Sequence, residues 1–197
     1  MWNCRGRDVD VKPGDILGFS SHSLMGLGIN LGTWGVPFWG LSHVGIVVRI
    51  GGDGPRVLAE STMTCPAPCE IQSKVVQGVQ VHRIADRVRL YRGKVWRYPL
   101  ARALCPIAER QLWEFTEAYL GASYDAIGAF RSRDTVLGIL ERHFRPENLM
   151  ALFCSEFVAA GLRHIGLFPT DKADRWNPNS LCRRLRRIGL YLKPERW

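Results

Sequence analysis

One cysteine, Cys154, lies in a stretch whose apolar side chains repeat with the period of a helix. Phe153, Phe157 and Ala160 recur at helical spacing, and Gly161 is a typical helix end. The pattern predicts that Cys154 opens this helix, where the positive end of the helix dipole would stabilise a thiolate. The stretch therefore offers a nucleophile, although a buried and unreactive thiol fits the same pattern.

A thiol nucleophile needs a histidine, and the histidine needs a third polar group to orient it. Of the five histidines, His43 stands on the clearest expected strand, which spans residues 42–50. His164 follows Cys154 by ten positions, which is roughly 15 Å along a helix and too far for contact. His43 is therefore the candidate base.

The chain after this strand turns back through a glycine-rich segment into a second expected strand at residues 56–62. If residues 52–53 form a two-residue loop, Glu60 faces Gly45 and shares one side of the sheet with His43. Gly45 has no side chain to separate them. A shift of one residue would turn Glu60 to the other side, so the pairing is a testable prediction.

The remaining pattern predicts an α+β fold in one domain over residues 1–197. His82 falls with Gln80 on the polar side of its expected strand, where we expect it to face solvent. Asn179 or Ser180 is the expected cap of the last helix. The further expected elements are strands at 15–19, 78–84 and 94–99 and helices at 106–120, 126–142 and 182–188.

The chain has 197 residues, is 46% hydrophobic and 23% charged, and carries a net charge of +9. Such a composition is typical of a globular protein, and the charge favours an anionic partner such as a membrane surface. No nucleic-acid motif accompanies it, so we expect no specific nucleic-acid partner. The last helix bears Arg183, Arg184, Arg186 and Arg187, which form either a binding patch or a solvated helix face.

Six cysteines in a chain of this length do not form a disulfide scaffold, and we expect free thiols in a reducing compartment. Cys65 and Cys69 lie in a proline-rich loop without a second pair of ligands at a zinc spacing. The first eight residues carry charges where an export signal would be apolar, which predicts a cytoplasmic protein. Peripheral membrane or envelope association stays open.

Five short motifs occur in a defined order. They are Gly14–Leu17, Ser42–Val47, Glu60–Ser61, Gly121–Asp125 and Phe153–Val158. This order resembles the circularly permuted papain-like cysteine hydrolases of the NlpC type, the YiiX/YaeF-like group. In the permuted arrangement the histidine precedes the cysteine in the chain, as it does here.

The resemblance implies a papain-like fold in which an antiparallel sheet or partial barrel packs against helices, with the catalytic cysteine at a helix N-terminus. It implies that Cys154 is the nucleophile, His43 the general base and acid, and Glu60 the group that orients His43. Tyr124 matches the family's turn and would line the substrate or oxyanion site. The resemblance implies neither a cofactor nor a metal.

The expected activity is hydrolysis of an amide or ester through an acyl-enzyme. The substrate would be a peptide, a cell-wall fragment or an acyl lipid. Two alternatives stay open on the same site: an acyltransferase or lipid-directed acyl hydrolase, and a noncatalytic module associated with a membrane or particle. A metal held by His43, Glu60 and Cys154 is a minor third alternative. The oligomeric state is not predicted.

Overall fold

The computed structural model describes residues 11–21, 40–63, 65–121, 146–169 and 176–197. Tyr124 and the helix expected at 126–142 lie outside these residues. Each of the strands that the sequence predicts is present, and the helix expected at 106–120 is present as well.

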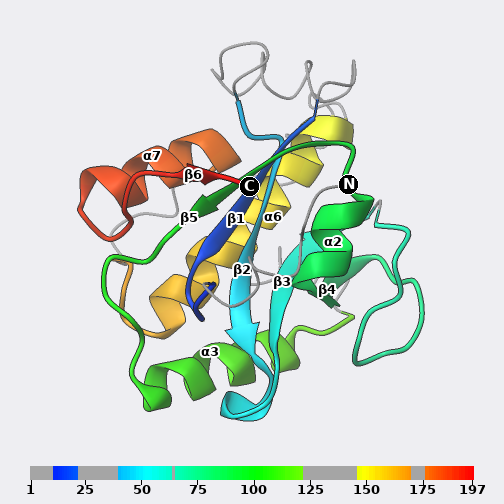
Figure 1. Ribbon diagram of the computed structural model, residues 1–197, viewed down its shortest axis with the longest axis horizontal. Coiled ribbons are helices and arrows are strands. Elements are labelled where there is room, and N and C mark those ends of the chain that lie inside the picture. The colour runs from blue at the N-terminus through cyan, green and yellow to red at the C-terminus, as the bar shows by residue number, and fades with distance from the viewer. Residues whose placement is uncertain (1–10, 22–39, 64, 122–145, 170–175) are drawn as a thin grey trace, which may run out of the picture.

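The described residues form one antiparallel sheet in the order β4-β3-β2-β1-β5-β6 (Figure 1). The alternation of side chains in each segment accounts for these strands, since alternate residues can then be buried on opposite faces. The strands are β1 (Ile16–Ser21), β2 (His43–Arg49), β3 (Arg56–Thr62), β4 (Gly78–Arg83), β5 (Gly93–Tyr98) and β6 (Glu195–Arg196). The antiparallel sheet predicted from the sequence is thus confirmed, and it is open, with β4 and β6 at its edges.

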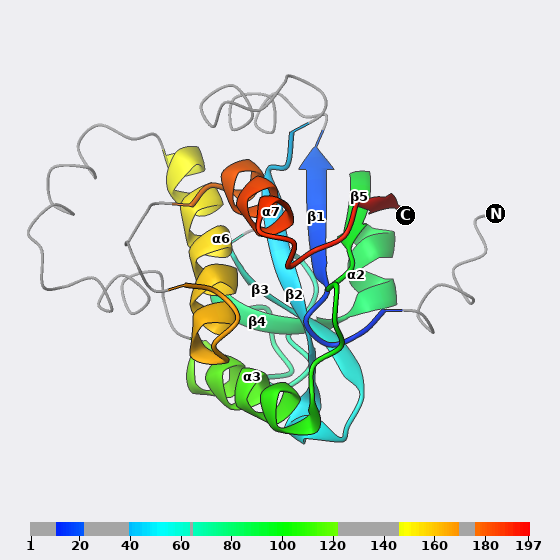
Figure 2. The same ribbon diagram turned by 90° about the vertical axis from the view of Figure 1, so that its left-hand side faces the viewer.

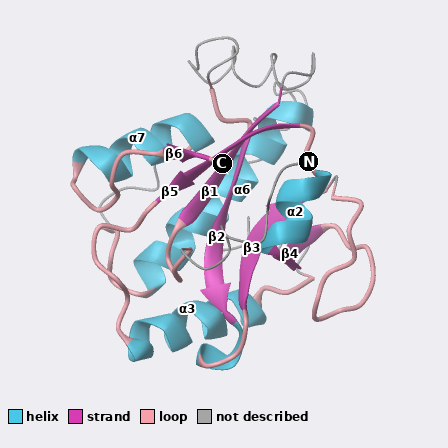
Figure 3. Ribbon diagram, viewed as in Figure 1, coloured by secondary structure: helices cyan, strands magenta, loops and turns pink. Residues whose placement is uncertain are grey.

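Helices cover both faces of this sheet, as Figures 2 and 3 show. The helices are α2 (Ile84–Leu90), α3 (Pro106–Ala118), α6 (Pro146–His164) and α7 (Pro178–Arg187). Val44 and Ile46 belong to the core beneath α6, whereas Val47 and Leu58 belong to the core beneath α2. Among the described helices, none combines the length and the apolar composition that a membrane span requires.

The β2–β3 hairpin has the register that the sequence predicts. Its paired residues run from Arg49↔Arg56 to Ile46↔Ala59, and in this register the next positions, just beyond the last pair, are Gly45 and Glu60. The turn is wider than two residues, because the Ile50 N–H donates to the Pro55 carbonyl at 3.1 Å and leaves residues 51–54 in the loop. In an antiparallel hairpin the register is defined by the sum of the two paired residue numbers. The wider loop leaves this sum unchanged.

The two strands of the hairpin then follow different neighbours. Past Ile46↔Ala59, β2 stays paired with β1 as far as Phe19↔His43. Over the same stretch, β3 stays paired with β4 as far as Thr62↔Gly78. His43 and Glu60 therefore lie where the sheet forks, beyond the last β2–β3 pair.

Two expectations about helix ends are wrong. Cys154 does not open its helix, because α6 begins at Pro146, eight positions earlier. The cap of α7 is Asn177, whose side chain accepts from the Ser180 N–H in a reciprocal capping box. Asn179 instead bonds to both backbone groups of Leu41, at 2.7 and 3.1 Å, and so ties α7 to the segment before β2.

Candidate catalytic site

His43 and Glu60 meet at the fork in the sheet, as the hairpin register predicts. Nε2 of His43 lies 2.7 Å from Oε2 of Glu60. The Glu60 side chain is fully buried and the His43 side chain is 15% exposed. A carboxylate in this position holds the imidazole in one orientation and favours its protonated form.

Cys154 is the second partner of His43. The cysteine has no exposed surface and belongs to the core beneath α6. Burial acts against the charged form of His43, but the charge of Cys154 and a hydrogen bond to it, together with Glu60, raise the pKa of His43 from 6.5 to about 9. Since Glu60 occupies Nε2, Nδ1 is the ring nitrogen left for the sulfur. The three residues that the sequence selects are thus brought together.

The position of Cys154 within α6 changes the source of its activation. The dipole of a helix acts within its first turn, whereas Cys154 lies eight positions after Pro146. The helix dipole is therefore not what activates Cys154. A protonated His43 beside the sulfur supplies the positive charge instead, as in thiolate–imidazolium pairs generally.

Arg87 of α2 completes the site, and the sequence analysis missed it. Its Nε donates to Oε1 of Glu60 at 2.5 Å, and the side chain is buried. Its guanidinium also lies over the ring of Phe19, 4.7 Å from the ring centre. Burial alone would raise the pKa of Glu60, but the charge of Arg87, followed by the bond to His43, lowers it from 4.5 to about 2. Glu60 is therefore held as an anion between two cations.

His82 also borders Glu60, and the expectation that it faces solvent is wrong. It is 2% exposed, because α2 and the loop before β4 cover this face. Its Nε2 lies 2.9 Å from Oε1 of Gln80, whose amide nitrogen donates to the carbonyls of Thr62 and Val76 at 3.0 Å. Those two bonds leave the Gln80 oxygen as an acceptor, so Nε2 of His82 carries the proton. That N–H also faces Oε1 of Glu60, 3.6 Å away.

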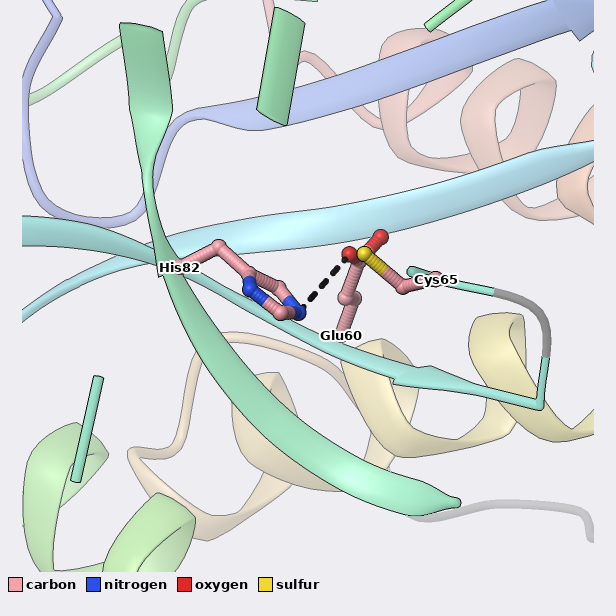
Figure 4. A group of neighbouring side chains, drawn as sticks. All are labelled: Glu60, Cys65 and His82. Carbon is pink, nitrogen blue, oxygen red and sulfur yellow. Dashed lines mark ion pairs between the residues drawn. The ribbon is translucent and has the colours of Figure 1, made fainter. Parts of the chain in front are cut away.

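Cys65 joins Glu60 and His82 in a buried cluster (Figure 4). One potential ligand atom from each residue lies within 4.8 Å of the other two, which is compatible with a metal site by distance. The donors are already engaged, however, since Arg87 occupies Oε1 of Glu60 and the proton on Nε2 of His82 points to Gln80. A cation at Oε1 would also lie beside the Arg87 guanidinium. The cluster therefore fits a hydrogen-bonded network better than a metal centre.

The ionic network predicts how stability depends on pH. The contributions of Glu60 and His43 to the free energy of unfolding should both be fully present between about pH 4.5 and 6.5. Glu60 has a lowered pKa, so its contribution is present above 4.5 and is lost as the pH falls towards 2. His43 has a raised pKa, so its contribution is present below 6.5 and is lost as the pH rises through 9. Each loss should be about 3 kcal/mol.

Urea unfolding at a series of pH values measures this dependence. Glu60→Gln should flatten the acid side of the profile, and His43→Gln should flatten the alkaline side. Variant profiles that stay parallel to the wild-type profile on both sides would contradict the assignment.

Comparison with known proteins yields a likeness of fold. No family model and no curated protein sequence matches the chain. Among solved structures, the crystal structure of the metalloprotein yiiX from Escherichia coli O157:H7 (DUF1105) aligns with a TM-score of 0.51 and 18% sequence identity. The alignment covers 90% of this chain and 82% of that chain. The α+β fold of this chain is therefore similar to that of yiiX.

Proposed function

We propose that this protein is a thiol hydrolase of the permuted papain-like kind, which cleaves an amide or ester bond through an acyl-enzyme. The observation that carries the proposal is the position of His43, bonded to Cys154 on one side and to the buried carboxylate of Glu60 on the other. A nucleophile, a base and a group that orients the base make up a complete thiol-hydrolase triad. Their order in the chain supports the permuted form of the family.

The proposed reaction has two steps. The Cys154 thiolate attacks the substrate carbonyl carbon, and the bond to the leaving nitrogen or oxygen breaks as His43 donates its proton to that atom. Neutral His43 then takes a proton from water, the resulting hydroxide attacks the thioester, and the carboxylic acid leaves Cys154. Glu60 stays ionised throughout and stabilises the imidazolium in the resting state.

Access to the sulfur is a requirement of this mechanism. Cys154 has no exposed surface, while the neighbouring imidazole of His43 is 15% exposed. The substrate therefore approaches along the exposed side of His43, and whatever covers the sulfur has to yield. A conformational step that uncovers the sulfur before it attacks the carbonyl is the expected kinetic consequence.

The fold neighbour yiiX is a metalloprotein, which raises the question of a metal here. Within the part of the chain that the structure describes, the residues that come closest to a ligand set are Glu60, Cys65 and His82. A cation there would displace Arg87 from Glu60 and the Nε2 proton from His82, and would draw Glu60 away from His43. No step of the proposed reaction therefore uses a metal.

Acylation by p-nitrophenyl acetate tests the proposal. We expect a burst of p-nitrophenol equal to the enzyme concentration and one acetyl group on Cys154 in the intact-mass spectrum. Cys154→Ser should abolish both, and His43→Ala should slow the burst by about 10²–10⁴-fold. An added amine that accelerates turnover and becomes acetylated would identify an acyltransferase. Acetylation spread over the other cysteines, without a burst, would overturn the proposal.

A further inference from the structure

Helix α7 presents a basic outer face. Its buried side consists of Leu181, Cys182 and Leu185, which pack into the main core. The residues on the opposite side are exposed, and none of them has an ion-pair partner among the residues that the structure describes. They are Arg183, Arg184, Arg186 and Arg187.

Two exposed apolar side chains follow the basic face in the chain. Ile188, which follows the helix, is 39% exposed, and Leu192 is 53% exposed. Lys193 is exposed beside them. The nearby carboxylate of Glu195 is directed to Arg97, at 3.4 Å, and so does not neutralise the arginines. Basic residues around a few exposed apolar side chains are typical of surfaces that rest on anionic bilayers.

The basic face is rigidly connected to the candidate catalytic site. Asn179 in the first turn of α7 bonds to both backbone groups of Leu41, two positions before His43. Ser155, which follows Cys154, donates its hydroxyl to the Trp176 carbonyl just before α7. A surface bound by α7 would therefore be held in a fixed position relative to His43 and Cys154.

We propose that the outer face of α7, with Ile188 and Leu192, docks this protein on an anionic phospholipid surface. The net charge of +9 attracts the protein to the surface, the arginines contact the lipid phosphates, and the two apolar side chains enter the interface. Docking would position the candidate catalytic site at the lipid surface, and it does not depend on the proposed reaction. Figure 2 shows that α7 lies on the opposite side of the sheet from α2, so exposed basic residues near α2 provide a matched control.

Vesicle flotation of the full chain tests the docking. We expect binding to phosphatidylcholine vesicles that contain phosphatidylglycerol, weaker binding as NaCl is raised, and little binding to phosphatidylcholine alone. Replacing Arg183, Arg184 and Arg187 with glutamine should weaken binding at least about tenfold. Ile188→Ser with Leu192→Ser should remove the binding that persists at high salt. Replacing exposed Arg83, Arg89 and Arg92, which lie on or next to α2, with glutamine, an equal loss of charge, should have little effect.

Three outcomes would overturn this proposal. They are equal binding to the two kinds of vesicle, a control variant that weakens as much as the α7 variant, and an α7 variant that loses retention on single-stranded DNA while its vesicle binding is unchanged. Measuring all variants in a Cys154→Ser background separates docking from catalysis, because the surface should bind whether or not the thiol reacts.

Discussion

Replacing His43 with alanine should slow the alkylation of Cys154 by iodoacetamide at about pH 6 by roughly a hundredfold. Iodoacetamide reacts with the thiolate, and an ordinary thiol is almost entirely protonated at that pH. In the wild-type protein, His43 has a pKa raised to about 9 and is therefore protonated beside the sulfur at that pH. Its positive charge stabilises the thiolate, and alanine removes that charge.

The chain provides internal standards for this measurement. Cys105 is exposed and reports the reactivity of an ordinary thiol at each pH. Cys182 is buried and no described histidine is paired with it; burial raises the pKa of its thiol, so it should react slowly throughout the range. Peptide mass mapping separates the three sites. The triad would be contradicted if the pH profile of Cys154 followed that of Cys105, or if it were the same in His43→Ala.

The contact between His43 and Glu60 could be predicted from the sequence because local signals determine it. Residues 42–62 form two runs rich in apolar, strand-forming residues that reverse at a cluster of glycines, which predicts both the strands and their register. The observed turn is wider than expected, yet it preserves the register. The predicted position of Glu60 beside His43 is therefore correct, although the predicted loop is too short.

The surroundings of this pair could not be predicted in the same way. Alternation along a strand shows which residues share a face, but not what covers that face. His82 shares a strand face with the polar Gln80, which predicts that this face is exposed to solvent. His82 is buried because α2 packs over the face. Helix α2 itself has only seven residues and no side-chain cap, so it lacks the start signal that sequence reasoning uses.

Two missed features did leave signals in the sequence. Pro146 followed by Glu147 is a typical first turn of a helix and would have placed the start of α6 well before Cys154. Glu60 follows three apolar residues in its strand and requires a cation when it is buried, and a single histidine leaves one carboxylate oxygen to be satisfied. That requirement indicates a second basic partner, although it does not identify Arg87.

Arg87→Met should destabilise the protein by about 3–5 kcal/mol, the usual cost of removing one partner from a buried ion pair. The Arg87 side chain is 9% exposed and that of Glu60 is fully buried, so the remaining carboxylate cannot regain water. Arg87 is also the largest influence that lowers the pKa of Glu60, so this pKa should rise in the variant. Low-pH alkylation of Cys154 should weaken as well, because a protonated Glu60 no longer supports the charged His43.

Arg89→Met is the matched control, since it lies on the same helix two positions away. Its side chain is 74% exposed and pairs with Asp86 at the surface, so its loss should cost less than about 1 kcal/mol. The double variant Arg87→Met/Glu60→Gln should be more stable than Arg87→Met alone, because it leaves no unpaired buried charge. Urea unfolding of the four proteins at neutral pH measures these differences. Equal stabilities of Arg87→Met and Arg89→Met, or a double variant less stable than Arg87→Met, would show that Arg87 does not hold Glu60 as an anion.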